Sequence, residues 1–122
     1  MELQKIEGVF TVCKVARLED IDFSGAFVFV SKTSEEISLV CETGYTPAKR
    51  IASEPGWRAL KVSGVLDFGM VGVIAKISNI LAEAEMSIFV VSTYNTDYIF
   101  LKEACFDRGV QVLGRKGYVI VD

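Results

Sequence analysis

The sequence predicts an α+β fold built from two related units, of which the first lacks a long helix. The main observation is an internal repeat, in which residues 27–42 align with residues 88–103 at a constant offset of 61 without a gap. Both copies have an apolar run, a polar turn, a second apolar run and a Glu, and the identical pairs are Val30 with Val91, Ser31 with Ser92 and Glu42 with Glu103. A fold assignment that overlooks a repeat of this kind would be wrong. The alternative is chance similarity between two hairpins of like composition.

The repeat extends on both sides of the hairpins. Gly56-Trp57 aligns with Gly117-Tyr118 at the same offset of 61, whereas Cys13–Val15 aligns with Leu60–Val62 at an offset of 47. The two offsets differ by 14 residues, which is about four turns of helix. We therefore expect a degenerate unit at residues 1–60 without its long helix and a complete unit at residues 61–122.

The first half of the chain is expected to be mainly β-structure. A first strand runs over residues 9–15, and residues 26–32 and 37–42 form a hairpin around a polar turn at 33–36. Their alternating or continuous apolar runs, bounded by polar residues, are typical of buried strands.

The segment between the hairpin and the next strand is the least regular. Thr46-Pro47 has the residues of an N-cap and a first helical position, and therefore predicts a short helix over residues 47–52. Glu54-Pro55-Gly56 should end this helix. Trp57–Ser63 is the next strand, and it matches both the last strand of the first copy and the first strand of the second. We expect this strand to belong to both units.

The clearest helix follows the loop at residues 64–72. Its apolar residues recur at steps of three and four and predict one buried face, namely Met70, Ile74, Ile77, Leu81 and Ala84. Lys76, Asn79 and Glu83 lie on the other face. Asp67 is placed to accept hydrogen bonds from the free amides of the first turn.

The rest of the chain completes a known order of elements. Residues 87–93 and 97–102 form the second hairpin, residues 104–115 form the last helix, and residues 118–121 form a final strand. Gly117 suits the left-handed position after the helix. The order strand, helix, strand, strand, helix, strand is the ferredoxin-like βαββαβ pattern, with both helices on one face of the sheet.

Composition narrows the classes of function. The 122 residues are 51% apolar and 24% charged, with a net charge of −3 and no cluster of Lys and Arg, so nucleic acid is not an expected partner. No apolar stretch reaches the ~20 residues of a membrane helix, and the N-terminus lacks the apolar core of a signal peptide. We expect a cytoplasmic protein that does not bind membranes.

Catalytic residues are scarce. The chain has no histidine, the commonest general base and transition-metal ligand. Cys13, Cys41 and Cys105 form neither a disulfide framework nor a CxxC metal pair. We expect no metal, no cofactor and no enzymatic activity. A small enzyme with Asp67 or Asp97 as its base would need a second catalytic group, and the sequence shows no such constellation.

The residues themselves indicate a site for a zwitterion. The loop before the long helix leads to free amides and a positive helix dipole, which favour a carboxylate. Asp67 and Asp97 suit an ammonium or guanidinium group, and Thr93 and Asn95 add neutral donors and acceptors. Each residue also has a structural interpretation, because Asp67 can simply cap the helix and Asn95 and Asp97 can simply shape the turn.

Three segments give the chain a family resemblance. Residues 57–68, residues 72–78 and the stretch Ser92-Thr93-Tyr94-Asn95-Thr96-Asp97-Tyr98-Ile99 resemble the small tandem ACT-domain proteins of bacteria and archaea, a family related to the amino-acid-binding domains of CASTOR-type arginine sensors. The resemblance covers nearly the whole chain. Glu85-Met86, where relatives commonly have a glycine-containing turn, and Gly109 inside the last helix depart from the family pattern.

The resemblance implies a regulatory module that binds an amino acid or a similar metabolite at an interface between ACT units, as a homodimer. It implies a pocket formed by the loop before the long helix and the second hairpin turn, with ligand-binding residues Val65, Leu66, Asp67, Phe68, Gly69, Val71, Gly72, Thr93, Tyr94, Asn95 and Asp97. The alternative is an ACT-type interaction or oligomerisation module that binds no small ligand.

Overall fold

The computed structural model describes residues 1–64 and 71–122, and these divide into two compact units. We call residues 8–57 the central unit, and residues 1–7 together with 58–122 the helical unit. Two long strands, β1 (Glu2–Val15) and β4 (Ala52–Val62), contribute to both units. The sequence led us to expect this only of β4. The domains expected at residues 1–60 and 61–122 remain a prediction. The compact units have different boundaries, since the chain passes from one unit to the other after residue 7 and again after residue 57.

The central unit is a sheet without an α-helix. Its strand order is β2-β3-β1-β4, and both the β1–β3 and the β2–β3 pairs are antiparallel. The hairpin strands are β2 (Val28–Lys32) and β3 (Ile37–Glu42). Short 3₁₀ turns at Leu18–Asp20 and Thr43–Tyr45 lie where longer helices would otherwise follow the strands. One cluster of buried residues in this unit consists of Cys13, Val15, Ile21, Leu39 and Cys41.

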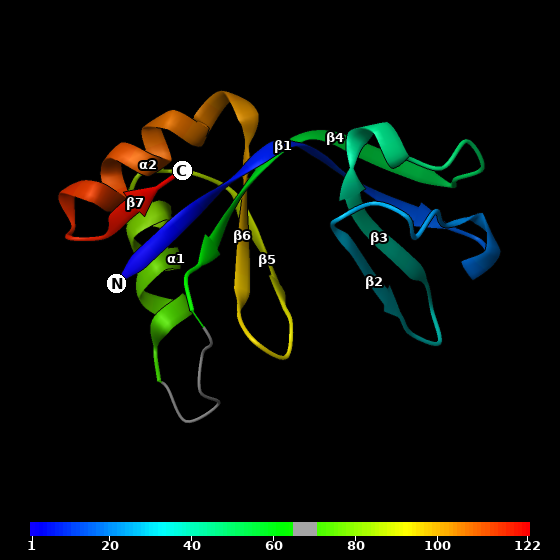
Figure 1. Ribbon diagram of the computed structural model, residues 1–122, viewed down its shortest axis with the longest axis horizontal. Coiled ribbons are helices and arrows are strands. Elements are labelled where there is room, and N and C mark those ends of the chain that lie inside the picture. Colours follow the sequence, from blue (N-terminus) through cyan, green and yellow to red (C-terminus); the bar gives the residue numbers. More distant parts are fainter. Residues whose placement is uncertain (65–70) are drawn as a thin grey trace. The chain divides into compact units, whose positions relative to one another are not determined.

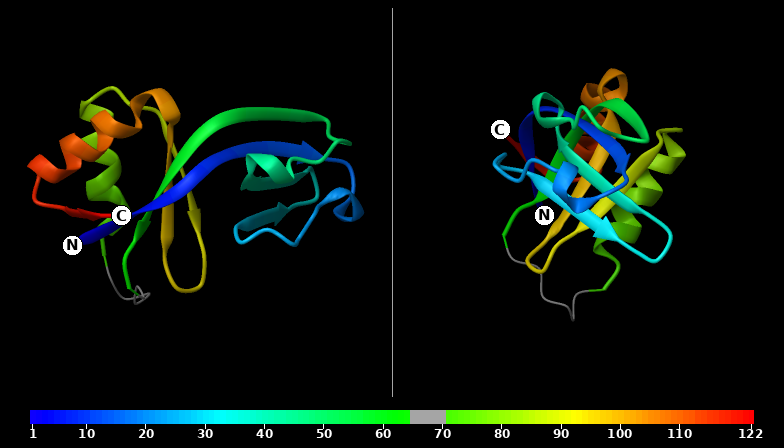
Figure 2. Two further views of the ribbon diagram at one scale, coloured as in Figure 1. Left: turned by 45° about the horizontal axis from the view of Figure 1, so that its top comes forward. Right: turned by 90° about the vertical axis from the view of Figure 1, so that its right-hand side faces the viewer.

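The helical unit contains both helices. Its elements after β4 are α1 (Val73–Glu83), β5 (Ile88–Ser92), β6 (Asp97–Lys102), a 3₁₀ turn at Glu103–Cys105, α2 (Phe106–Arg115) and β7 (Val119–Val121). The strand order is β1-β4-β6-β5, and β7 pairs in parallel with β1. Both helices cover the same face of the strands (Figures 1 and 2). This is the expected ferredoxin-like α+β order, except that the start of β1 lies between β4 and β7.

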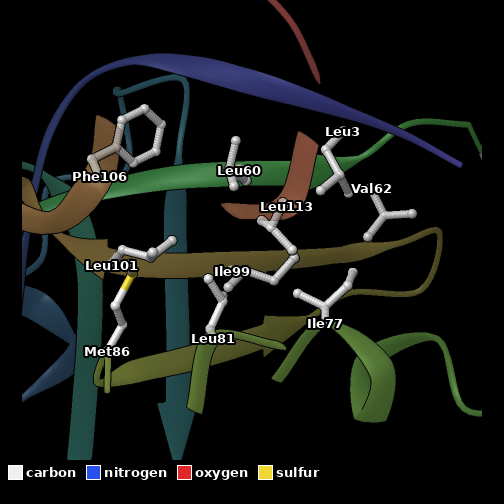
Figure 3. Packing of buried hydrophobic residues seen from close by; sticks show 10 residues of the cluster. All are labelled: Leu3, Leu60, Val62, Ile77, Leu81, Met86, Ile99, Leu101, Phe106 and Leu113. Carbon is white, nitrogen blue, oxygen red and sulfur yellow. The ribbon is translucent and has the colours of Figure 1, made fainter. Parts of the chain in front are cut away.

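The apolar stripe of the long helix is confirmed as core at Ile77 and Leu81, and Ile74 and Ala84 are partly buried against the same cluster, whereas Met70 lies outside the described residues. Ile77 and Leu81 of α1 are fully buried, and they face Leu60 of β4 and Ile99 of β6 in Figure 3. Leu113 of α2 is packed in the same cluster. Full burial of each such side chain contributes about 1.5–3 kcal/mol.

The helix expected over residues 47–52 is wrong. Thr46 does not cap a following helix, because its amide and hydroxyl both donate to the Thr43 carbonyl, at 3.1 and 2.7 Å, and so close the preceding 3₁₀ turn. Arg50 then donates to the Pro47 carbonyl at 2.8 Å and to the Ser53 hydroxyl at 3.2 Å. Hydrogen bonds from these side chains thus stabilise a non-helical backbone conformation and replace the backbone hydrogen bonds that a helix would form.

The stop expected at Glu54-Pro55-Gly56 is also wrong, because these residues lie inside β4. Proline is tolerated in a sheet at an edge strand, where its missing N–H is not needed. β4 occupies an edge position in the central unit's order β2-β3-β1-β4. Gly56 has a φ of +84°, which allows the backbone to bend there.

The two hairpins match each other at an offset of 60, and not at 61. Val28 pairs with Cys41 as Ile88 pairs with Leu101, and Lys32 pairs with Ile37 as Ser92 pairs with Asp97. The burial patterns of β3 and β6 agree residue by residue at this offset. A slip of one residue would place every side chain on the opposite face, so the aligned pairs at 61 are not structurally equivalent.

Two residues that depart from the family pattern serve the helix ends and packing. Glu85, after α1, has a φ of +61°, and the Met86 amide donates to the Leu81 carbonyl at 3.0 Å, as in a Schellman-type end. Gly109 of α2 lies so close to the sheet that a Cβ would come within 2.6 Å of Leu101 Cδ2. The glycine therefore permits the close approach of α2.

Candidate functional site

Part of the predicted site lies outside the described residues. These predicted ligand-binding residues, which fall in 65–70, are Val65, Leu66, Asp67, Phe68 and Gly69. The described flanks of this loop are Gly64 and the pair Val71-Gly72. Gly64 and Gly72 have φ values of +79° and +77°, a conformation that glycine adopts at little cost.

The described N-cap residue of α1 is a glycine. Gly72 is the N-cap residue, and within residues 1–64 and 71–122 no side chain is seen to accept a hydrogen bond from the amides of the first turn. The first amides of a helix have no partner within the helix, and the helix dipole favours an anion beside them. Val71, just before it, is 93% exposed.

The second hairpin turn is held by its two threonines. The Thr93 amide donates to the Thr96 carbonyl at 2.8 Å, and the Thr96 amide donates to the Thr93 hydroxyl at 3.3 Å. The Thr96 side chain is buried, and its hydroxyl donates to the Val62 carbonyl at 2.7 Å. This hydrogen bond places the turn directly beside the last residue of β4, two residues before Gly64.

The other predicted residues of this turn are more exposed. Tyr94 is 81% exposed, and Asn95 is also on the surface. Asp97 is half-buried, and its carboxylate accepts a hydrogen bond of 2.5 Å from the Ser92 hydroxyl across the hairpin. Asp97 thus already has one protein donor, which leaves further lone pairs for a cationic ligand.

A groove of about 500 Å³ lies at the start of α1 in the helical unit. It includes Val71 and Gly72 from the prediction and adds Lys76, Asn79 and Lys116. Thr93, Tyr94, Asn95 and Asp97 do not line it, so in the described part of the chain the two halves of the predicted site are not joined in one cavity.

The polar residues of this groove were not predicted as site residues. Lys76 and Asn79 were placed only on the exposed face of the long helix, and Lys116 was assigned only to the end of α2. The sequence spacing of Lys76 and Asn79 could have indicated their role. They lie four and seven positions after Gly72, and residues at these steps lie on the same side of a helix. Lys116 comes from a distant element, and sequence spacing gives no indication of it.

Two other kinds of functional feature, metal-binding clusters and membrane-spanning helices, were considered for the described residues. Among residues 1–64 and 71–122 there is no group of three His, Cys, Asp or Glu side chains that could hold a metal ion. Within the same ranges, no helix combines the length and the apolar character needed to cross a membrane.

Comparison with known proteins identifies the domain type. The ACT domain model matches residues 52–115, which is more than half of the chain. No curated protein sequence matches the chain.

Several solved structures share the fold. A crystal structure of a protein from Agrobacterium tumefaciens has a TM-score of 0.86 at 24% identity, and the match covers 98% of this chain and 91% of that one. The regulatory subunit of aspartate kinase from Thermus thermophilus, solved ligand-free, gives 0.64 at 6% identity, with 93% and 95% covered. Aspartate kinase from Clostridium acetobutylicum gives 0.61 at 14% identity, with 91% of this chain but 33% of that chain covered.

Proposed function

The chain belongs to the ACT domain family, and from this premise we propose that it is a non-catalytic regulatory module that binds an amino acid. The ligand binds at an interface between the ACT units of two copies, in a cytoplasmic homodimer. The likeness in fold to a regulatory subunit of aspartate kinase supports a regulatory role. The absence of histidine from the sequence supports a role other than catalysis.

The groove at the start of α1 carries this proposal. The first turn of α1, whose N-cap residue is Gly72, adds backbone amides, and Lys76 and Lys116 add two ammonium groups to the groove that contains Gly72. Amides at a helix start together with lysines form a binding site for a carboxylate. The Asn79 side-chain oxygen can accept a hydrogen bond from the ligand's ammonium group.

The predicted site residues complete the proposal. We propose that the loop residues Val65, Leu66, Asp67, Phe68 and Gly69 contact the ligand beside Val71 and Gly72. Thr93, Tyr94, Asn95 and Asp97 then belong to the same binding surface, and Asp67 and Asp97 bind the ligand's cationic group. The hydrogen bond from Thr96 to Val62 supports this, because it brings the hairpin turn to the strand from which the loop leaves.

Exposed apolar residues at the groove support a second copy as the partner. Val71 and Met1 both line the groove, and they are 93% and 50% exposed. Apolar side chains gathered at one place on a surface mark interaction sites. A second copy of the chain would cover them and close the open groove.

We further propose that the central unit is a degenerate ACT unit. Its order β2-β3-β1-β4 corresponds to the helical unit's order β5-β6-β4-β1, and the second strand of each hairpin, β3 or β6, is followed by a 3₁₀ turn. In this view the central unit has lost its helices and has kept its sheet.

Titration calorimetry against the twenty amino acids, arginine included, tests the proposal. We expect one or a few of them to bind, and expect Lys76→Ala and Lys116→Ala each to weaken binding about tenfold or more, since each removes a charge-assisted hydrogen bond. Arg115→Ala is the matched control, because Arg115 has the same charge and is exposed next to Lys116 but does not line the groove.

The outcomes separate the two candidate functions. If none of the amino acids binds, while the chain self-associates and Val71→Asp dissociates it, the interaction module that binds no small ligand is the correct function. If an amino acid binds and the two lysine variants bind it like the control, the ligand site does not lie in this groove. Size-exclusion chromatography with light scattering measures the association in both cases.

A further inference from the structure

The central unit covers one face of its sheet without an α-helix. At the offset of 60, Leu39 and Cys41 correspond to Ile99 and Leu101, which pack with residues of α1 and α2 in one core (Figure 3). Leu39 and Cys41 are each only 1% exposed, and Ile21, from the connection between β1 and β2, belongs to the same buried cluster. In the central unit, a connection between strands thus helps to cover the face that helices cover in the helical unit.

Two connecting segments carry every exposed large apolar side chain of the central unit, which the structure describes throughout. One segment is 17–23, between β1 and β2, and the other is 45–51, between β3 and β4. These apolar residues, which are between 37% and 61% exposed, are Leu18, Phe23, Tyr45 and Ile51. Outside the two segments, the large apolar residues of this unit are at least partly buried.

The two segments are neighbours, and their backbone is held in place. A Cβ built on Gly25, two residues after the first segment, would lie 3.3 Å from the ring of Tyr45 in the second. The Ile51 amide donates to the Lys14 carbonyl at 2.7 Å, which fastens the end of the second segment to β1. Exposed apolar residues that lie close together mark interaction surfaces, and a preformed surface loses less entropy on binding.

The charges of the two segments are equal and opposite. Segment 17–23 contains three carboxylates and one arginine, a net charge of −2, and we call it the acidic segment. Segment 45–51 contains one lysine, one arginine and no acidic residue, a net charge of +2, and we call it the basic segment. Each segment therefore presents a surface that is complementary in charge to the other, with apolar residues on both.

The two segments of one copy do not neutralise each other. Within the acidic segment, Arg17 pairs with Glu19 at 3.7 Å and with Asp20 at 3.9 Å. In the basic segment, Arg50 donates to a backbone carbonyl and to a serine hydroxyl, and Lys49 is exposed. No ion pair joins the two segments within the described residues. The complementary charges therefore remain available to another molecule.

We propose that this surface joins two copies of the chain, with the acidic segment of each copy against the basic segment of the other. In a twofold-symmetric contact the same pair of surfaces meets twice, so both segments of both copies are used. A partner with a single sign of charge would match only one segment, whereas a second copy matches both. Leu18 and Phe23 then pack against Tyr45 and Ile51 of the second copy, and Glu19 faces its Lys49.

This contact is separate from the one proposed at the groove of the helical unit. It requires no ligand, because both of its surfaces belong to the protein. A chain with two separate contact surfaces forms assemblies larger than a dimer, and either surface alone forms a dimer. The two contacts can therefore be tested independently of each other.

Sedimentation equilibrium of the full chain over a range of concentrations tests the contact. Val71→Asp disrupts the contact proposed at the groove, and this variant should still form a dimer through the central unit. In the Val71→Asp background, Phe23→Ala and Ile51→Ala should each weaken the dimer about tenfold or more, because each removes apolar surface that the contact buries. Both side chains are more than half exposed, so the circular dichroism spectrum should not change.

Charge exchange tests which segments meet. In the same background, Glu19→Lys and Lys49→Glu should each weaken the dimer about tenfold or more, because each places like charges opposite each other. The double variant should recover most of the lost affinity, because opposite charges face each other again. Glu83→Lys is the matched control, because it makes the same change of charge at an exposed position of α1 in the helical unit.

The proposal is overturned if Val71→Asp is a monomer up to millimolar concentration, or if Phe23→Ala and Ile51→Ala leave its dimer unchanged. It is also overturned if the double charge exchange is no stronger than the single variants, or if Glu83→Lys weakens the dimer as much as Glu19→Lys. A wild-type chain that is no larger than a dimer and that Phe23→Ala dissociates would support this contact. The same result would count against a second copy at the groove.

Discussion

The Thr96 hydroxyl donates a 2.7 Å hydrogen bond to the Val62 carbonyl and so fastens the β5–β6 turn to the end of β4. Thr96 is only 4% exposed, and Val62 is fully buried. This contact connects the two segments in which the sequence predicts a binding site. It is a tertiary hydrogen bond between residues 34 positions apart in the chain, and no local pattern in the sequence predicts it.

We expect Thr96→Val to destabilise the protein by about 1–3 kcal/mol. The substitution keeps the shape of the side chain but leaves the buried Val62 carbonyl without a donor. Thr96→Ser keeps the hydroxyl and should lose less. Urea unfolding followed by circular dichroism measures both, and an equal loss for the two variants would show that the hydrogen bond contributes little.

Gly109→Ala should destabilise the protein by about 1–3 kcal/mol, although alanine is the better helix former. The new Cβ would lie 2.6 Å from Leu101 Cδ2 and 3.3 Å from Met86 Sδ, and relief of this overlap requires α2 or the core to shift.

Gly114→Ala, in the same helix, is the matched comparison. A Cβ at Gly114 meets nothing within 4 Å, so helix propensity alone should act and stabilise the protein by about 1 kcal/mol. Thermal unfolding of the two variants should therefore give shifts of opposite sign. Shifts of the same sign would contradict the assignment of Gly109 to close packing.

Glu85→Gly should stabilise the protein by about 1 kcal/mol. Glu85 is a non-glycine residue with a φ of +61°, where the Cβ of an L-residue is unfavourable and glycine has no such penalty. Glu83→Gly, two residues earlier inside α1, should instead cost about 1 kcal/mol. Denaturant midpoints check both, and a loss at position 85 would be evidence against this account of the helix end.

Stability should fall as the pH rises from about 9 to 11. Burial raises the pKa of the Cys41 thiol from its ordinary 9.0 to about 11, and burial also raises the pKa of Cys13. The folded state therefore keeps these protons when the unfolded chain loses them, so the stabilisation is complete below pH 9 and is lost towards pH 11.

Cys41→Ala should flatten this decline in the free energy of unfolding, whereas Cys105→Ala, at a partly exposed position, should leave its slope unchanged. Unfolding curves recorded at pH 8, 9, 10 and 10.5 provide the measurement. A decline of the same slope in wild type and Cys41→Ala would assign the effect to other groups.

The repeat could be recognised from the sequence, but its register could not. Residues 27–30 and 88–91 are continuous apolar runs, so no alternation marks which face each residue occupies. An offset of 60 also gives three identities, namely Phe29 with Phe89, Val30 with Val90 and Thr33 with Thr93, as many as the offset of 61. The decisive information is the shared turn, in which Thr33 and Thr93 occupy the same place.

Local signals failed where tertiary pairing decides the structure. Pro55 and Gly56 are sequence signals for a break, yet they lie in a strand because β4 is at an edge of the central unit. The helices were predictable because apolar residues occur with helical spacing in each, Ile77 with Leu81 in α1 and Phe106 with Leu113 in α2. The groove was only partly predictable, since Lys116 reaches it from α2 and no local pattern relates it to Gly72.

The contribution of β1 and β4 to both units has a consequence for the way this protein evolves. A gene fragment for residues 61–122 would encode both helices but would lack Leu3 and Leu60, which are fully buried in their core. Recombination at the midpoint of the gene would therefore deliver an incomplete core. Exchange of residues 61–122 alone would therefore disrupt the core, whereas substitutions within the whole chain would leave its two long strands intact.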